Sequence, residues 1–267
     1  MTYCVGLRLN RGLVFMSDTR TNAGVDNFSM TRKMFTFEVP GERVITILTA
    51  GNLATTQALI SLLEERSKAH DERDPSILHE PSMFQVARVV GETLSEVIQK
   101  SNGKNGQKSE SKFRASVIVG GQVKGGDPTL FMVYPEGNFV EVTQETPFFQ
   151  IGEAKYGKPI LVRAYDADMT FDDAIKLLCV SFDSTIKANL SVGMPLDVLT
   201  YDGDALLLPK PIRIEADDDS YNAIAKGWGS ALRKAFASLP NYQPPNADGN
   251  DRTEQIMPGD TRGANPV

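Results

Sequence analysis

The sequence predicts an α+β fold in which two antiparallel sheets pack face to face and pairs of helices cover their outer faces. Two observations lead to this prediction. The segments fall into runs of strands and runs of helices rather than a strict alternation, which favours layered α+β architecture over a doubly wound parallel sheet. The predicted strands also come in pairs joined by short turns, as antiparallel hairpins do.

The first third of the chain contains two predicted hairpins. In residues 2–9, TYCVGLRL, the apolar side chains alternate, so the odd-numbered residues share one face of the strand. The turn signal NRG leads to a returning strand at 13–18. Residues 33–39 and 43–50 form a second pair around the turn signal PGE.

The period then changes to that of helices. Apolar residues in 52–66 recur at helical spacing, and Ser82 begins an S-x-x-Q capping box that opens a helix reaching about residue 100. A polar Gly/Lys/Ser loop follows at 101–112 and is expected to be mobile. Strands resume in the next part of the chain, at 115–121, 129–135 and 139–143.

The last part of the chain is predicted to contain three helices and two strands. Thr170, with an aspartate three residues later, is expected to cap the most amphipathic helix. The predicted elements are a short helix after 151–157, helix 170–190, strands 196–202 and 211–216, and helix 220–239. We therefore expect a single domain over 1–239. The Pro/Asn/Asp/Gly-rich remainder, 240–267, is expected to be a disordered or loosely docked tail.

Composition excludes several classes of protein. The chain has 267 residues, a net charge of -6 and a pI near 5.1, which argues against nucleic acid or an anionic membrane as a partner. Its two cysteines, Cys4 and Cys179, suggest no disulfide framework. The start of the chain does not read as a secretory signal, and no apolar run approaches the ~18 residues of a membrane span. We expect a soluble, cytoplasmic protein.

Thr2 is the first candidate catalytic residue. A threonine hydroxyl needs a base, and at a chain terminus the residue's own α-amino group can serve, since its unperturbed pKa is ~7.7–8.0. Removal of Met1 would place hydroxyl and free amine on one residue, and the small side chain of threonine makes that removal plausible. The Met-Thr dipeptide alone is weak evidence, because many proteins begin in this way.

Asp18 and Lys33 strengthen that hypothesis. Asp18 ends the second predicted strand, and the hairpin returns the chain close to Thr2. Lys33 follows fifteen residues later, and its charge would disfavour protonated forms nearby, which keeps the amine a usable base. Taken singly, turn capping explains Asp18 and a solvated surface charge explains Lys33.

Together these residues resemble the start of proteasome β-type subunits and of the related bacterial protease HslV, both N-terminal nucleophile hydrolases. The spacing of Thr2 and Asp18, the D-T-R-T stretch containing Arg20 and Thr21, and the later Arg-Lys-Met match that pattern. The stretch ILTAGNLATTQ resembles the family's strand-to-helix turn and carries Gly51. Within the superfamily the chain most resembles the bacterial proteasome-related family called Anbu, which also begins Met-Thr without a propeptide.

The resemblance implies a four-layer αββα sandwich through about residue 239. It also implies a threonine peptidase in which the Gly51 N–H stabilises the oxyanion, and self-assembly into rings or stacked ring-like particles around a chamber. Peptides or unfolded proteins would be the substrates, and neither a cofactor nor a metal is implied. Thr49 is expected to border the specificity pocket. An ATPase partner stays open.

The chain departs from the family pattern at two places. Glu153 stands where a serine that assists the terminal amine is expected. In NLSVG, Asn189 stands at an aspartate position and Val192 at a serine position, unless Ser191 substitutes after a one-residue shift. Because such neighbouring groups tune and shuttle the proton, activity is expected to be weak or substrate-selective.

Two alternatives to a peptidase stay open: an inactive assembly protein of the same fold, and an amidohydrolase for small amides. Other candidate sites are weaker. His70 and His79 lie in a polar stretch away from Cys4, so a Cys/His dyad is disfavoured. The aspartates at 217–219 are better explained by helix capping than by a metal. Cys179 and Trp228 are expected to be core residues.

Overall fold

The structure is a computed structural model that describes residues 2–22, 28–68, 75–102 and 113–242. The predictions of a mobile loop and of a disordered tail fall mainly on residues outside these ranges. The described part contains two five-stranded antiparallel sheets and five helices, which confirms the predicted fold class.

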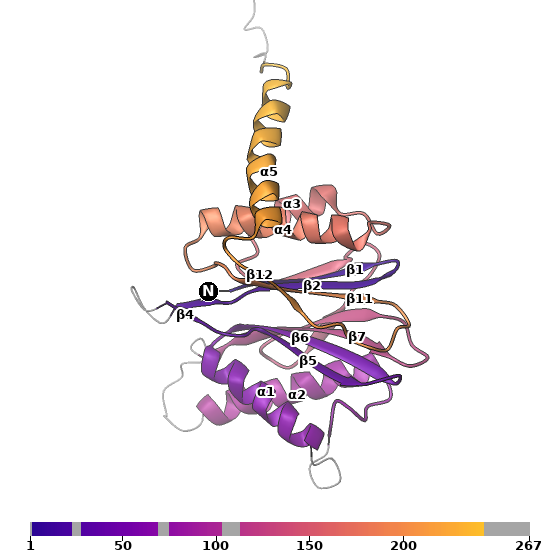
Figure 1. Cartoon of the computed structure of the whole chain (residues 1–267). Helices are drawn as coiled ribbons and strands as arrows, with labels where there is room; N and C mark the ends of the chain where they lie inside the picture. Colours follow the sequence, from indigo (N-terminus) through magenta and orange to yellow (C-terminus); the bar gives the residue numbers. More distant parts are fainter. Residues whose placement is uncertain (1, 23–27, 69–74, 103–112, 243–267) are drawn as a thin grey trace, which may run out of the picture. The chain divides into compact units, whose positions relative to one another are not determined.

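The first sheet carries the start of the chain. Residues 3–9 pair with 12–18 through the turn between them, so that Cys4 lies opposite Ser17. The N-terminus lies at one end of this sheet, beside the label of β4 (Figure 1). In spatial order its strands are β10 (Phe148–Gly152), β1 (Tyr3–Leu9), β2 (Gly12–Asp18), β11 (Leu196–Asp202) and β12 (Ile212–Ile214).

The second sheet faces the first and is built from the middle of the chain. Its longest pairing joins the strand at 43–51 to the one at 115–123 over nine residues. In spatial order its strands are β5 (Met34–Val39), β6 (Arg43–Gly51), β7 (Ala115–Val123), β8 (Thr129–Val133) and β9 (Phe139–Glu141). A separate two-stranded ribbon consists of β3 (Arg20–Asn22) and β4 (Phe28–Met30).

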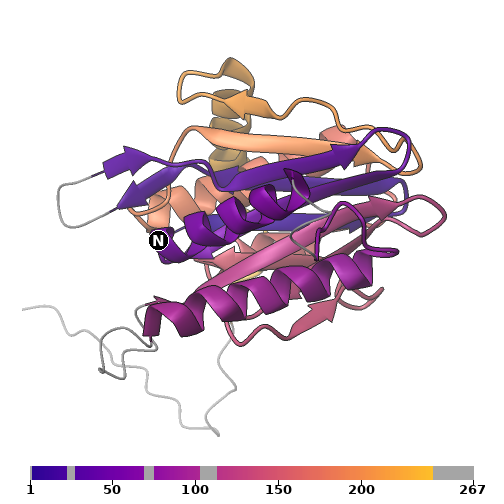
Figure 2. The same ribbon diagram turned by 90° about the horizontal axis from the view of Figure 1, so that it is seen from below.

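Helices cover the outer faces of both sheets, which gives four layers in the order α, β, β, α. α1 (Leu53–Lys68) and α2 (Met83–Asn102) cover the second sheet, as Figure 2 shows. α3 (Lys158–Ala164) and α4 (Phe171–Ala188) cover the first sheet (Figure 1). None of the described helices combines the length and apolar character that a membrane span needs.

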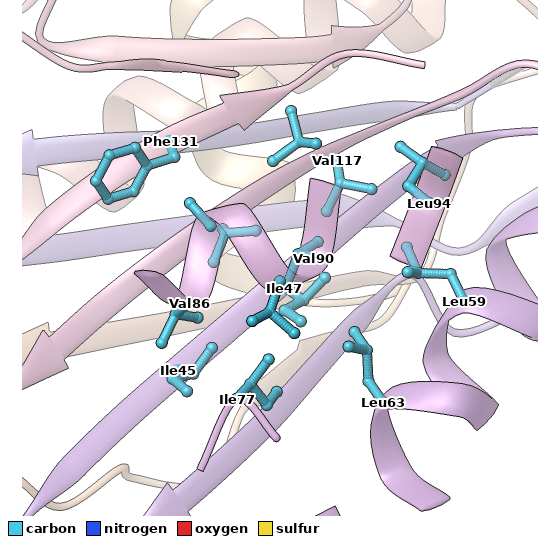
Figure 3. Packing of buried hydrophobic residues seen from close by; sticks show 14 of the residues in the cluster. Ile45, Ile47, Leu59, Leu63, Ile77, Val86, Val90, Leu94, Val117 and Phe131 are labelled. Carbon is cyan, nitrogen blue, oxygen red and sulfur yellow. The ribbon is translucent and has the colours of Figure 1, made fainter. Parts of the chain in front are cut away.

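Three apolar clusters hold the layers together. Between the two sheets, Cys4 and Phe15 of the first sheet pack with Leu48 and Ile118 of the second. The odd-numbered residues of β1 instead face α3 and α4, which confirms the predicted alternation. In the third cluster, α1 and α2 pack against the second sheet (Figure 3). Each sheet therefore packs against the other sheet on one face and against helices on the other.

The N-caps predicted at Ser82 and Thr170 are confirmed, but the reciprocal bond of the capping box is not formed, since Gln85 Oε1 has no partner among the described residues. The Ser82 hydroxyl accepts a hydrogen bond from the N–H of Gln85 at 3.3 Å, and α2 begins at the next residue. Thr170 accepts from the Asp173 N–H at 3.1 Å before α4. Of the aspartates at 217–219, Asp218 has a capping role, because it accepts from the Tyr221 N–H at 2.7 Å.

The chain separates into two compact units, residues 1–229 and 230–267. The first contains all three sheets, and α5 (Asp219–Ala237) runs across the boundary. The prediction that Trp228 is a core residue is wrong, since its side chain is only partly buried. Ile224 and Ala225 of α5 pack against the apolar cluster that contains β1, α3 and α4, but Trp228 is not part of that cluster, because tertiary contacts and not helical spacing alone decide which positions are buried.

Leu94 of α2, which is fully buried against the second sheet, tests the packing of the outer layer. Leu94→Ala should lower the free energy of unfolding by about 2–5 kcal/mol, because it leaves a cavity between helix and sheet. Leu207→Ala is the matched control, since that side chain is 58% exposed, and its effect should stay within about 0.5 kcal/mol. Urea denaturation followed by circular dichroism measures both. Equal losses would contradict the layer packing.

Candidate active site

Thr2 lies immediately before β1, next to the edge strand β10. Its carbonyl oxygen accepts a hydrogen bond from the N–H of Glu153 at 2.6 Å, which extends the pairing of the two strands by one step. Gly152 has φ +84, and a Cβ there would come within 1.9 Å of the same carbonyl oxygen. Only glycine fits this close approach, so the end of β10 fixes the backbone of Thr2.

Asp18 is the last residue of β2, and its side chain is completely buried beside Thr2. Its Oδ1 accepts from the N–H of Tyr3 at 3.0 Å and from Lys33 Nζ at 2.7 Å, and its Oδ2 accepts from the N–H of Gly193 at 3.4 Å. Burial raises the pKa of the Asp18 carboxyl, whereas the Lys33 ammonium and the two N–H groups act to lower it. The carboxyl therefore ties the residue after Thr2 to an ammonium.

Lys33 comes from the other sheet, because it directly precedes β5. Its side chain is 6% exposed, and Nζ also donates to the carbonyl oxygen of Arg20 at 2.6 Å. Its own carbonyl accepts from the N–H of Thr49 on β6 at 3.0 Å. The ion pair with Asp18 thus joins the two sheets at the end where Thr2 lies.

Tyr3 anchors the strand next to Thr2 from the opposite face. Its hydroxyl shares a hydrogen bond with Ser181 Oγ of α4 at 2.7 Å and accepts another from the Gln150 amide. The ring lies 4.5 Å from that of Phe182, centre to centre. Burial raises the pKa of the Tyr3 hydroxyl to about 12. Backbone and side chain of this residue are therefore both fixed.

Gly51 ends β6 with φ +118, a conformation that favours glycine. A Cβ there would lie 2.4 Å from the carbonyl oxygen of Arg114. The next residue, Asn52, caps α1 by accepting from the N–H of Thr55 at 3.0 Å. Gly51 therefore lies directly before a helix N-terminus, where the helix dipole favours negative charge.

A pocket of about 320 Å³ brings these residues together. Thr2, Lys33 and Gly51 line it, as do Thr21 and Thr49, which the sequence also singled out. Sequence reasoning did not select the remaining lining residues, which are Thr31, Arg32, Ala50, Asn52, Leu53 and Thr56. Their signal was adjacency, since each lies within a few positions of Lys33 or Gly51.

The other predicted site residues, Asp18, Arg20, Glu153, Asn189 and Ser191, do not line this pocket. Asn189, at the C-terminus of α4, donates to Glu153 Oε2 at 3.0 Å and accepts from the N–H of Ser191 at 3.0 Å. Arg20 donates to the carbonyl oxygen of Leu190 at 3.1 Å. Val192, at the position where the family pattern has a serine, is fully buried in an apolar cluster. Its side chain has no hydroxyl that could replace the serine.

A larger pocket of about 770 Å³ lies elsewhere, along β10 and α3 and the edge of the second sheet. None of the predicted site residues lines it. Cys4 is fully buried and donates its thiol toward the carbonyl oxygen of Thr49 at 3.7 Å, and burial raises the pKa of that thiol. Within the described ranges, no three or more His, Cys, Asp or Glu side chains are grouped as a metal site would require.

The four-layer sandwich, with Thr2 directly before its first strand and next to the buried Asp18–Lys33 pair, has the arrangement expected of the proteasome-like class of N-terminal nucleophile hydrolases. The family model described as "Proteasome subunit" matches residues 2–200. A proteasome subunit beta of Methanopyrus kandleri is 24% identical over 200 residues, 74% of this chain and 86% of that protein. A proteasome subunit beta 2 of Pyrobaculum neutrophilum is 23% identical and covers 74% and 88%.

Solved structures of Anbu, the ancestral β-subunit, are more similar. The protein from Yersinia bercovieri is 45% identical with a TM-score of 0.84, covering 91% of this chain and all of that one. The helical assembly from Pseudomonas aeruginosa is 46% identical with a TM-score of 0.84, covering 93% and 100%. The chain therefore belongs to the proteasome subunit family, in its Anbu group.

The buried ion pair yields a stability prediction. Lys33→Met should lower the free energy of unfolding by about 3–5 kcal/mol, because it leaves the Asp18 carboxylate buried without a counter-charge. Adding Asp18→Asn should recover part of this loss. Lys100→Met is the matched control, since its pair with Glu96 is exposed and contributes about 0–1 kcal/mol. Denaturant titration compares the variants, and equal effects at both lysines would argue against the pair's role.

The close approach of Gly152 to Thr2 yields a second prediction. Gly152→Ala should destabilise the protein by more than Gly41→Ala, although both glycines have positive φ. A Cβ at Gly41 meets nothing within 4 Å, so that variant bears only the left-handed backbone cost of about 1–2 kcal/mol. Thermal and denaturant unfolding measure the difference. A Gly152→Ala protein no less stable than Gly41→Ala would contradict the described packing at Thr2.

Proposed function

We propose that this protein is a threonine hydrolase that cleaves peptide bonds with Thr2, which becomes the first residue once Met1 is removed. The observation that supports this most directly is the position of Thr2. It lines the pocket, its carbonyl is held by the edge strand β10, and the next residue is hydrogen-bonded to the buried Asp18–Lys33 pair. Membership of the proteasome subunit family supports the same activity.

In the proposed reaction the Thr2 α-amine takes the proton from the Thr2 hydroxyl while Oγ1 attacks the substrate carbonyl carbon. The tetrahedral intermediate collapses, the C–N bond breaks, and the proton passes from the α-ammonium to the departing amine. An ester between Thr2 and the acyl part of the substrate remains. Water then hydrolyses this ester with the same amine as base, which restores the hydroxyl.

Lys33 and Asp18 would set the electrostatics of this base. The Lys33 ammonium disfavours protonation of a nearby amine, and the Asp18 carboxyl fixes the ammonium in place through the 2.7 Å contact. Both side chains are buried, so water screens their interaction weakly. They act as positioning and electrostatic groups, with Thr2 alone forming bonds to substrate.

Gly51 would supply the oxyanion contact. It lines the same pocket as Thr2, at a strand end with φ +118 and directly before the N-terminal turn of α1. A backbone N–H at such a junction, together with the helix dipole, stabilises negative charge on the substrate oxygen. Preorganised donors of this kind contribute about 2.7–4 kcal/mol to a barrier in well-studied hydrolases.

The groups around Glu153 favour a second candidate function, that of an assembly protein with little or no activity. The Glu153 carboxylate accepts from Asn189, and the buried Val192 stands where the family has a serine. Neither Glu153 nor any of residues 189–192 lines the pocket, so this part of the chain supplies no hydroxyl to the pocket wall. A hydrolase for small amides is a third candidate, since this superfamily includes both activities.

Self-association is part of the proposal. The Anbu protein of Pseudomonas aeruginosa was solved as a helical assembly, and its whole length aligns with this chain. We infer that this protein likewise assembles with copies of itself into a ring-like or helical particle, which would restrict access to the pockets. Peptides or unfolded segments are the proposed substrates.

Intact-protein mass spectrometry of the purified protein, before and after treatment with a peptide epoxyketone, tests the activity. The expected result is loss of the Met1 mass and a single adduct on Thr2, because the epoxyketone needs a hydroxyl and a free amine on one residue. Thr2→Ser, which keeps the hydroxyl, should still form the adduct, and Thr2→Ala should not. Both variants have side chains small enough for Met1 to be removed.

Retained Met1 in the native protein would rule out the proposed base, since the amine would no longer belong to Thr2. Removal of Met1 without an adduct, and with unchanged hydrolysis of fluorogenic peptides in Thr2→Ala, would favour the assembly protein. Adducts on small-amide probes but not on peptide probes would favour the amidohydrolase.

A further inference from the structure

The pocket beside Thr2 has an unbalanced set of polar groups. Eleven residues line its volume of about 320 Å³, and none of them is an aspartate or glutamate. Two of them, Arg32 and Lys33, are basic, and five are threonines. A wall with guanidinium, ammonium and hydroxyl donors but no carboxylate is suited to a ligand that accepts hydrogen bonds.

Three basic side chains surround the site, but they differ in what they already contact. Lys33 is buried and paired with Asp18 at 2.7 Å. Arg20 donates to the carbonyl oxygen of Leu190 at 3.1 Å and does not line the pocket. Arg32 lines the pocket, is exposed, and has no hydrogen-bond or ion-pair partner in the described part of the chain. Of these three described side chains, Arg32 is therefore the one whose charge is available to a ligand.

The threonines of the pocket also differ in whether their hydroxyls already have a hydrogen-bond partner. The Thr56 hydroxyl donates to the carbonyl oxygen of Leu53 at 3.0 Å, so its proton is already used. The hydroxyls of Thr21, Thr31 and Thr49 have no partner among the described residues. Three hydroxyls are thus open to a ligand in a pocket that also contains the charge of Arg32. Ala50 and Leu53 add apolar surface that suits a short alkyl stem.

We propose that this pocket binds an acidic side chain, that of the aspartate or glutamate immediately before the bond to be cut. The assignment rests on the proposed function, because it takes Thr2 as the group that faces the scissile carbonyl. The carboxylate accepts from the Arg32 guanidinium, with the threonine hydroxyls as further donors, and the methylene groups contact Leu53. A lysine at the same position meets the like charge of Arg32 and is disfavoured.

Binding to the Thr2→Ala protein tests this assignment without requiring turnover. The probes are three fluorescein-labelled peptides that share one sequence and differ only in the residue before the scissile bond: glutamate, glutamine or lysine. Fluorescence anisotropy should show the glutamate peptide binding about five- to tenfold more tightly than its glutamine isostere, and the lysine peptide binding most weakly. The preference should shrink as salt is added, because Arg32 is exposed.

Arg32→Gln in the same background identifies the residue responsible. The affinity ratio of glutamate to glutamine peptides should fall close to one. Arg88→Gln is the control, because it removes the same charge from an exposed side chain of α2 that does not line the pocket. That variant should keep the ratio of the Thr2→Ala protein.

Equal affinity for the glutamate and glutamine peptides would overturn the assignment, as would an unchanged preference in Arg32→Gln or the absence of saturable binding by all three. Failure of the proposed function has a different signature. In that case the glutamate preference persists and depends on Arg32, while the protein with an intact Thr2 forms no epoxyketone adduct.

Discussion

The buried ion pair between Asp18 and Lys33 is the interaction on which the rest of the site depends. It joins the last residue of β2 in one sheet to the residue before β5 in the other, at the end of the sandwich where the chain begins. Removing two charged groups from water costs free energy, so a buried ion pair is stable only when further hydrogen bonds satisfy both groups. Here they come from Tyr3, Gly193 and the carbonyl of Arg20.

The same contacts connect fold and chemistry. Because Asp18 holds the N–H of Tyr3 and β10 holds the carbonyl of Thr2, the first residues of the strand cannot shift without breaking the pair or the sheet edge. The strand end at Gly51 brings a helix N-terminus to the same pocket. The proposed nucleophile, the charge of Lys33 and the proposed oxyanion donor thus come from three different elements that the four-layer packing brings together.

Much of this was predictable from sequence because it is local. The alternation of apolar residues in β1 predicted which of its side chains share a face. Ser82 and Thr170 predicted where two helices begin, since an N-cap depends on residues only three positions apart. The strand at 148–152 was missed, because a five-residue run is short and its partner β1 lies about 145 positions away. Trp228 was wrongly predicted to be a core residue, and Arg32 was not selected as a pocket residue. Both depend on tertiary packing, which decides what a side chain contacts.

The central claim is that the α-amine of Thr2 acts as the base in a pocket organised by Asp18 and Lys33. The pH dependence of the rate at which a peptide epoxyketone modifies Thr2 measures this directly. The account predicts a rate that rises through one ionisation at or below ~8, the range of an α-amino group. A rate that shows no rise anywhere between about pH 4 and about pH 9 would contradict it, because the free amine would then play no part in activating the hydroxyl.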